Sequence, residues 1–488
     1  MGQVQQAINR IVWRTKRGNE PLARAGVMMD LHGICQSTMV QLTGGAFLTG
    51  YLLALGAREI LIGIAAALPL MAKLSQLFTS WRIERSGNWW RTAFQGALVG
   101  RLPLALAALL PFMGLPEGWM PWVLITVVAV TSLGGAVWEI AFLTWMAELI
   151  PLRIRGTFWG KRTRVAEFAG MIVALAAAIL FDLWRDANPG SLNGFAMIFG
   201  IAAVVATLGI VFLRLIPVPE HPSTRHEQQS LIATLARPAR DVNFKSLLTF
   251  VGFWGFGVGL IGPFTAVYML EELRLSFVTV TVLVTLPSAI IALTQPYWGR
   301  LTDHFGSKPV LQAATYIVSL STALWMISAP GRVWPLFMLQ IISGIGWSAY
   351  HIGINSMMLK LAPPQARSSY VASVGAMFAV SQAVSPIIGG FLLSGLKGAG
   401  LESLTVYYIL FGASFGLRLF STPLLTKLNE SDGVPIGHMI RVMGRFRSMG
   451  AAPGTEFLFD YTYTHMARIA DFITRDRRGR RIWKRRNQ

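Results

Sequence analysis

Several ionisable or polar side chains lie inside long apolar runs of this sequence, where a charge is costly unless it faces a helix-bundle interior or a water-filled path. Such groups can bind a polar solute or carry a proton, and an imidazole that titrates near pH ~6.5 suits the second task. The residues that meet this description are Asp30, Arg101, Glu139, Glu167, His351 and Asn355. They are the candidates for a pathway for solute or protons.

Depth within the apolar runs groups four of these residues. At ~1.5 Å per helical residue, Arg101 lies roughly 15 Å from the start of its run, and Glu139 and His351 lie at a comparable depth. Asn355 follows His351 by one helical turn on the same face. We therefore expect these side chains to line one cavity.

Glu139 has three interpretations. The depth of Arg101 permits a buried ion pair that would only hold two helices together, and the alternatives are proton coupling through Glu139 or direct contact with a solute. His351 likewise fits either a transport role or a hydrogen-bonded packing role.

Asp30 and Glu167 lie closer to the ends of their runs. Arg24 lies within reach of Asp30, which favours a gate or helix-capping role for this carboxylate. Glu167 has Arg164 and Lys161 one to two helical turns away, and either cation would neutralise it.

The surroundings of Glu139 and His351 repeat along the chain. The first copy contains Trp138, Glu139, Pro151 and Arg155, and the second contains Tyr350, His351, Pro363 and Arg367, 212 positions later throughout (138 to 350, 151 to 363, 155 to 367). Two similar membrane halves with a pocket between them are typical of secondary transporters.

The composition places these halves in a membrane. Of 488 residues, 53% are hydrophobic and 14% are charged, which is too apolar for a soluble protein and predicts an all-α polytopic membrane protein. The single cysteine, Cys35, supplies neither a disulfide nor a metal-ligand set, so we expect no metal and no cofactor.

Twelve runs are long enough to cross a bilayer, at roughly 20 residues each. They cover residues 28–55, 60–80, 92–113, 121–149, 165–183, 195–216, 247–270, 278–298, 310–327, 333–361, 371–393 and 404–425. The predicted organisation is a basic N-terminal segment (1–27), a six-helix bundle (28–216), a polar linker (217–245), a second six-helix bundle (246–427) and a basic tail (428–488).

The formal net charge of +20 would suggest nucleic acid as a partner of a soluble protein. Here the cations gather on one side of the predicted spans, so we attribute the charge to topology and expect no nucleic-acid partner. We expect the protein to lie in the cytoplasmic (inner) membrane. The uneven distribution of cations predicts that both of its termini are in the cytoplasm. The tail is expected to lie on anionic lipid headgroups or to bind a protein partner, and a solvated tail is the alternative.

A loop between the eighth and ninth runs carries a recognisable motif. It reads Gly299, Arg300, Leu301, Thr302, Asp303, His304, Phe305, Gly306, Ser307, Lys308, Pro309, Val310, Leu311. This resembles the G-x-L-x-D-x-x-G-x-[RK]-x-x-L loop of the major facilitator superfamily (MFS). The equivalent loop of the first half is degenerate, with Glu84 and Gly87 at the positions of Asp303 and Gly306.

The resemblance implies an MFS fold and a gate. Asp303 and Lys308, with partners such as Arg155, would close the cytoplasmic side, and Gly299, Gly306, Arg367 and Glu84 belong to the same gate motif. The alternative is that these residues only set topology and loop shape. The fifth run contains no proline, which departs from the proline-glycine motif of drug and proton antiporters in the superfamily and argues against a multidrug role.

The expected function is therefore proton-coupled transport of a small solute by alternating access. No nucleotide-binding loop of the G-x-x-x-x-G-K-[ST] type is present, and we expect no enzyme activity. Two alternatives remain open: a lipid or pigment flippase, and a non-transporting membrane scaffold or assembly factor with the same fold.

Overall fold

The computed structural model describes residues 20–86, 88–150, 152–218, 241–363 and 367–428, together with residues 430, 437 and 439. Within these ranges the chain is helical, and the β-structure consists of one isolated bridge between Ala329 and Arg332. The linker between residues 219 and 240, and almost all of the tail, lie outside the described residues.

The first half contains six predicted runs, several of which form consecutive helices. They are α2 (Glu20–Thr43) with α3 (Gly45–Ala54), α4 (Glu59–Ala72) with α5 (Ser75–Ser86), α6 (Trp89–Arg101) with α7 (Leu104–Leu109) and η1 (Leu110–Phe112), α8 (Met120–Leu149) preceded by η2 (Glu117–Trp119), α9 (Leu152–Ala187) and α10 (Asn193–Arg214). The break between α2 and α3 occurs at Gly45, whose φ of +49° suits glycine.

The second half repeats this plan. Its helices are α12 (Val242–Ile261) with α13 (Phe264–Val267) and the π-helical turn η3 (Tyr268–Glu272), α14 (Phe277–Phe305), α15 (Ser307–Thr322) with α16 (Leu324–Ile327), α17 (Trp334–Leu361), α18 (Arg367–Gly398), and α19 (Ser403–Ser421) with η5 (Thr422–Lys427). Each of the twelve predicted runs therefore corresponds to one helix or to consecutive helices.

In the described part of the chain, 9 helical segments are long and apolar enough to cross a membrane. The runs at 28–55, 60–80 and 333–361 are also helical, but their helices do not meet the requirements of length and apolar composition together. One of these helices, Glu59–Ala72, is apolar but too short. The all-α membrane fold is confirmed, and the prediction of twelve spans is consistent with it.

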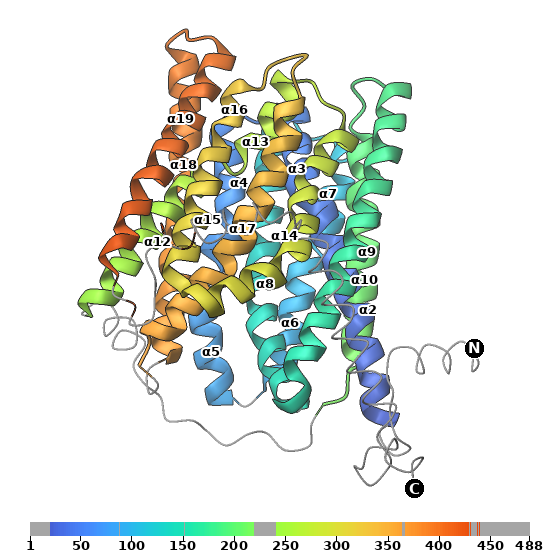
Figure 1. The fold of residues 1–488 in the computed structure, drawn as a ribbon. Coiled ribbons are helices and arrows are strands. Elements are labelled where there is room, and N and C mark those ends of the chain that lie inside the picture. The colour runs from blue at the N-terminus through green and yellow to red at the C-terminus, as the bar shows by residue number, and fades with distance from the viewer. Residues whose placement is uncertain are drawn as a thin grey trace, which may run out of the picture.

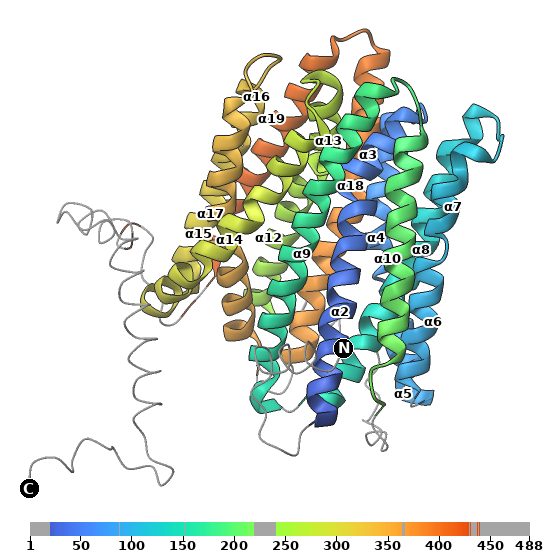
Figure 2. The same ribbon diagram turned by 90° about the vertical axis from the view of Figure 1, so that its right-hand side faces the viewer.

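The helices form two neighbouring bundles, coloured blue to green and yellow-green to orange-red in Figures 1 and 2. We call the end where α10 finishes and α12 begins the linker end, and the opposite end the distal end. Between the bundles, α4 packs against α18 and α9 against α14.

The apolar core is shared at the distal end and divided at the linker end. The distal core takes side chains from both halves, among them Phe47, Tyr51, Phe195, Phe264, Tyr268, Phe277 and Phe411. At the linker end each half has its own core: Met29, Trp89, Trp145 and Ile216 lie in that of the first half, and Phe244, Trp298, Phe305 and Val310 in that of the second. The halves are thus joined by apolar packing at the distal end.

Candidate functional site

Glu139 lies on α8 and is paired with residues of the second predicted run. Gln76 Nε2 donates to Glu139 Oε2 at 2.9 Å, and Lys73 Nζ lies 3.7 Å from the same oxygen. The side chains of Lys73 and Glu139 are 48% and 49% exposed. An ion pair this long and this exposed contributes little to stability.

The buried ion pair between Glu139 and Arg101, one of the three interpretations of Glu139, does not form in this structure. Arg101 is 3% exposed, and its Nη2 donates to Gln36 Oε1 at 2.8 Å and lies 3.4 Å from His32 Nε2. The reason is helix rotation: successive side chains on α8 point about 100° apart. Trp138 therefore faces the Arg101 guanidinium at 5.3 Å, while Glu139 turns toward Gln76.

Arg101 belongs to a buried polar cluster within the first half. His32 is fully buried, and its Nδ1 lies 2.8 Å from the Gly209 carbonyl oxygen. Among the described residues, Arg101 forms no ion pair with a carboxylate, and its Nη1 lacks a hydrogen-bond partner. The sequence did contain a signal for this cluster, since His32 and Gln36 are polar residues one helical turn apart in an apolar run.

The second half holds a comparable buried guanidinium that the sequence reasoning missed. Arg418 on α19 is 6% exposed, and its Nη1 donates to Thr322 Oγ1 at 2.9 Å. Its position inside the last apolar run was the available signal. In the part of the chain that the structure describes, Arg101 and Arg418 are thus buried guanidinium groups in opposite halves that donate to neutral side chains.

His351 and Asn355 lie on α17, and both are exposed. The His351 ring packs 5.8 Å from that of Trp347 and 5.9 Å from that of Tyr350. The fully buried Trp254 of α12 stacks on Tyr350 from the other side. The aromatic cluster thus packs against the imidazole of a residue that remains exposed.

The remaining candidates lie on α2 and α9. Asp30 is half-buried and interacts electrostatically with Arg162. Arg162 Nε donates to the Met29 carbonyl oxygen at 3.2 Å. The side chain of Arg24, the partner expected for Asp30, lies outside the described residues, and Glu167 is exposed on α9.

The gate motif forms the turn between α14 and α15. Gly306 has a φ of +96°, a conformation that favours glycine, and α15 begins at the next residue. Asp303 is exposed at the end of α14, and Gly299 lies one turn before it. The side chains of Glu84, Arg155 and Arg367 lie outside the described residues.

A carboxylate from beyond the last helix caps α15. Glu430 accepts hydrogen bonds from the backbone N–H groups of Ser307 (2.8 Å) and Lys308 (2.7 Å) and from Lys360 Nζ (2.6 Å). Burial raises the pKa of Glu430, but the hydrogen bonds from Lys360, Ser307 and Lys308 outweigh it and hold the pKa below its usual value. Lys308 Nζ donates to the carbonyl oxygens of Thr426 and Leu428. In this conformation Glu430, rather than Asp303, faces the helix N-terminus.

The distal interface contains polar contacts that join the halves. Asp182 on α9 accepts hydrogen bonds from the first two N–H groups of α14, with Oδ1 at 3.0 Å from Phe277 N and Oδ2 at 2.8 Å from Val278 N. The Phe277 ring packs 4.5 Å from that of Phe181. A Cβ on Gly50 would lie 2.4 Å from Phe277 Cζ, so only glycine leaves room for this ring.

A second polar contact lies between α4 and α18. Lys397 Nζ donates to Glu59 Oε1 at 2.6 Å, and Ser394 Oγ donates to Glu59 Oε2 at 3.2 Å. A Cβ on Gly63 would meet the Pro386 carbonyl oxygen at 2.4 Å, and one on Gly390 would meet Glu59 O at 2.9 Å. The glycines thus permit the close approach of these two helices.

This arrangement defines a class of protein: a helical membrane protein whose two six-run bundles join at one end and carry exposed polar groups in their middle. The comparison with protein families is specific. Residues 246–434, which form the second half, match the model of the Major Facilitator Superfamily.

Similarity to curated proteins is partial. The chain is 30% identical to the tetracycline resistance protein, class H, of Pasteurella multocida, over 28% of this chain and 34% of the relative. It is 26% identical to multidrug resistance protein 1 of Bacillus subtilis (strain 168), over 41% of this chain and 49% of the relative. The matched segments thus span about a third to a half of the length of these relatives.

Two solved structures share the fold over most of their length. The nucleoside transporter NupG aligns with a TM-score of 0.60 and 14% identity, covering 83% of this chain and 99% of that chain. A bacterial homologue of the iron transporter ferroportin in an inward-facing state aligns with a TM-score of 0.62 and 15% identity, covering 83% and 98%. At these identities the likeness concerns the fold.

Proposed function

We propose that this protein is a proton-coupled secondary transporter that moves a small solute across the cytoplasmic membrane by alternating access. The observation that carries the proposal is the divided core. One apolar core joins the halves at the distal end, and two separate cores fill the linker end. A two-bundle protein packed in this way rocks about its closed end to expose a central path alternately to each side.

The polar groups at mid-depth support the same conclusion. Lys73 and Glu139 of the first half are about half exposed, and His351 and Asn355 of the second half are exposed as well. A charge within a membrane span is stable when water reaches it. The proposal places these side chains on opposite walls of an aqueous path between the bundles.

Glu139 is the proposed proton carrier. Its carboxylate has one hydrogen bond from Gln76 and a loose ion pair with Lys73, so protonation would release Lys73 to bind an anionic or polar group of the solute. Asp30, Arg101 and Glu167 are assigned supporting roles, because Arg101 is buried inside its bundle and Glu167 is exposed on α9.

We assign the gate motif a role in the outward-facing state, in which the linker end is closed. In the inward-facing arrangement proposed here, Asp303 is exposed and ready to bind. When the linker end closes, Asp303 would approach the first half near Arg155, and Glu84 and Arg367 would form the symmetric contact. The linker end is then cytoplasmic, as the positive-inside rule predicts for this sequence.

The first test concerns Glu139. In proteoliposomes with an imposed proton gradient, we expect Glu139→Gln to abolish uphill accumulation while exchange of solute down its own gradient continues. Tetracycline and nucleosides are the first solutes to assay, because proteins similar to this chain carry these names.

The matched control is Asp186→Asn, which removes a carboxylate at the exposed distal end of α9. We expect it to transport as the wild type does. Proton-driven accumulation that is unchanged in Glu139→Gln would remove Glu139 from the coupling mechanism.

A further inference from the structure

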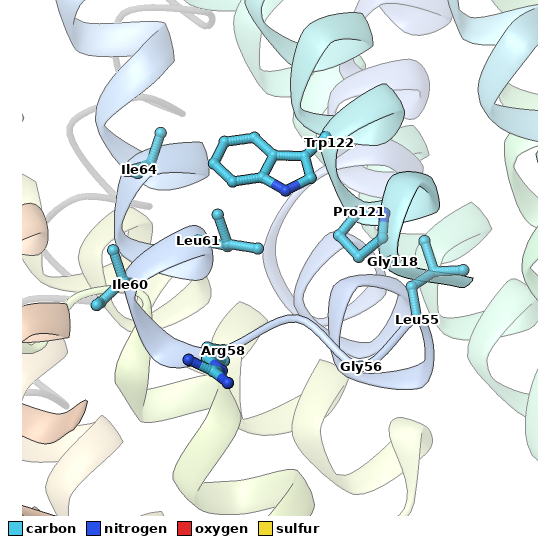
Figure 3. A pocket seen from close by; sticks show the side chains of 9 residues that line it. All are labelled: Leu55, Gly56, Arg58, Ile60, Leu61, Ile64, Gly118, Pro121 and Trp122. Carbon is cyan, nitrogen blue, oxygen red and sulfur yellow. The ribbon is translucent and has the colours of Figure 1, made fainter. Parts of the chain in front are cut away.

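A hollow of about 550 Å³ opens at the distal end of the first half (Figure 3). It lies between the turn that joins α3 to α4 and the start of α8, and its lining includes Arg58, Ile60, Leu61, Ile64, Gly118 and Trp122. A second hollow, of about 530 Å³, lies between α12, α18 and α19. Each is formed by helices of one half, so neither belongs to the path between the bundles.

Exposed tryptophans mark the depth of the first hollow in the membrane. They are Trp119 (65% exposed), Trp122 (52%), Trp184 (39%) and Trp334 (61%), and all four lie at or next to the distal ends of helices. Tryptophan concentrates at the level of lipid headgroups, where its ring is partly apolar and its N–H remains hydrated. Trp122 therefore places the hollow at the headgroup boundary of the distal leaflet.

The two ends of the hollow differ in chemistry. Arg58 is exposed at the start of α4, and its side chain has no hydrogen bond or ion pair in the part of the chain that the structure describes. The adjacent Glu59 does not neutralise it, because Glu59 turns to Lys397 of the other half. From Arg58, α4 runs toward the bilayer centre and presents Ile60, Leu61 and Ile64 to the hollow, as Figure 3 shows.

We propose that this hollow binds an anionic phospholipid of the distal leaflet. The Arg58 guanidinium contacts the phosphate, the Trp122 ring covers the glycerol region, and an acyl chain lies along the apolar face of α4. The surface of a membrane-spanning bundle is in contact with lipid, so an apolar hollow at this depth is filled by lipid, and the unpaired cation selects a negatively charged headgroup. This inference concerns a structural ligand and does not depend on the transported solute.

Native mass spectrometry of the full-length protein tests the proposal. The protein is released from nanodiscs that contain phosphatidylglycerol and phosphatidylcholine with identical chains, and retained lipid is counted. We expect phosphatidylglycerol to be retained in preference to phosphatidylcholine, and Arg58→Gln to lower that preference about fivefold, as the loss of one cation near the surface predicts.

Two further variants make the result specific. Arg332→Gln removes an exposed cation at the distal end of the other half and is expected to leave the preference unchanged. Gly118→Leu fills the hollow without changing charge, since no atom lies within 4 Å of a Cβ at this position, and is expected to lower retention of both lipids. Equal losses in Arg58→Gln and Arg332→Gln, or undiminished retention in Gly118→Leu, would overturn the proposal.

Discussion

At the scale of single residues, sequence identified which groups are unusual but not which way they face. The depth of Arg101 and Glu139 was readable from the hydropathy of their runs. Their partners depend on the rotation of α8, which points Trp138 at Arg101 and Glu139 at Gln76. If α8 were rotated about its axis by about 100°, the angle between successive residues, Glu139 would point where Trp138 points now. The local sequence does not determine this rotation.

The contacts of Glu430 could not be predicted from sequence either. Its carboxylate caps a helix that begins 123 positions earlier, so no spacing rule connects the two. The contact joins the start of the C-terminal tail to α15 and, through Lys360, to α17.

Replacement of Glu430 tests this contact. We expect Glu430→Gln to lower the stability of the protein by about 1 to 2 kcal/mol at neutral pH. The wild-type side chain is 2% exposed, and the substitution removes the charge of the carboxylate that caps α15. Since the folded pKa lies below the usual 4.5, the stabilisation is fully present above about pH 4.5 and is lost as the pH falls through the folded pKa.

Tryptophan fluorescence during heating, from pH 7 to pH 4, measures the effect. The difference in melting midpoint between wild type and Glu430→Gln should be constant from pH 7 to about pH 4.5 and should begin to shrink below it. Glu402→Gln, a change at an exposed distal position, is the control. A difference that stays constant with pH would argue against an ionised cap.

At the scale of elements, the distal contact between α9 and α14 crosses the interface between the halves. Asp182 caps α14 at its first two N–H groups, and Phe277 enters a pocket of Phe181, Phe195 and Phe47 beside Gly50. A carboxylate at a helix N-terminus is favoured by both hydrogen bonding and the helix dipole. These contacts can form only while the distal end is closed.

Removing the charge of Asp182 should weaken the closed distal end. We expect Asp182→Asn to raise the population of the distally open state about fivefold, as a loss of about 1 kcal/mol of capping energy predicts. The measurement is the distance distribution between spin labels at Ala187→Cys and Ala399→Cys, two exposed distal positions on opposite halves, in a Cys35→Ser background.

A second variant acts on the apolar part of the same contact. Gly50→Ala places a methyl group against the Phe277 ring and should shift the distances in the same direction, whereas Gly416→Ala, where no atom lies within 4 Å of an added Cβ, should not. If both Asp182→Asn and Gly50→Ala leave the distances unchanged, α9 and α14 do not hold the distal end closed.

At the scale of the whole molecule, the fold was the part most accessible from sequence. Apolar runs of membrane-crossing length, the repeat at 212 positions and the Gly299 to Leu311 motif predicted two six-run bundles of the MFS type. The conformation was not accessible, because it depends on contacts such as Phe277 with Gly50 between residues far apart in sequence. Neither was the solute, since the walls of the path come from many helices.

The central claim is that the two bundles exchange between a state closed at the distal end and a state closed at the linker end. Two pairs of spin labels in one set of proteoliposomes measure both ends: Ala187→Cys with Ala399→Cys at the distal end, and Arg82→Cys with Leu359→Cys, both exposed, at the linker end. We predict that acidification or solute lengthens one distance while it shortens the other, and that Glu139→Gln abolishes the response to pH. Distances that stay fixed at both ends under all of these conditions would contradict alternating access in this protein.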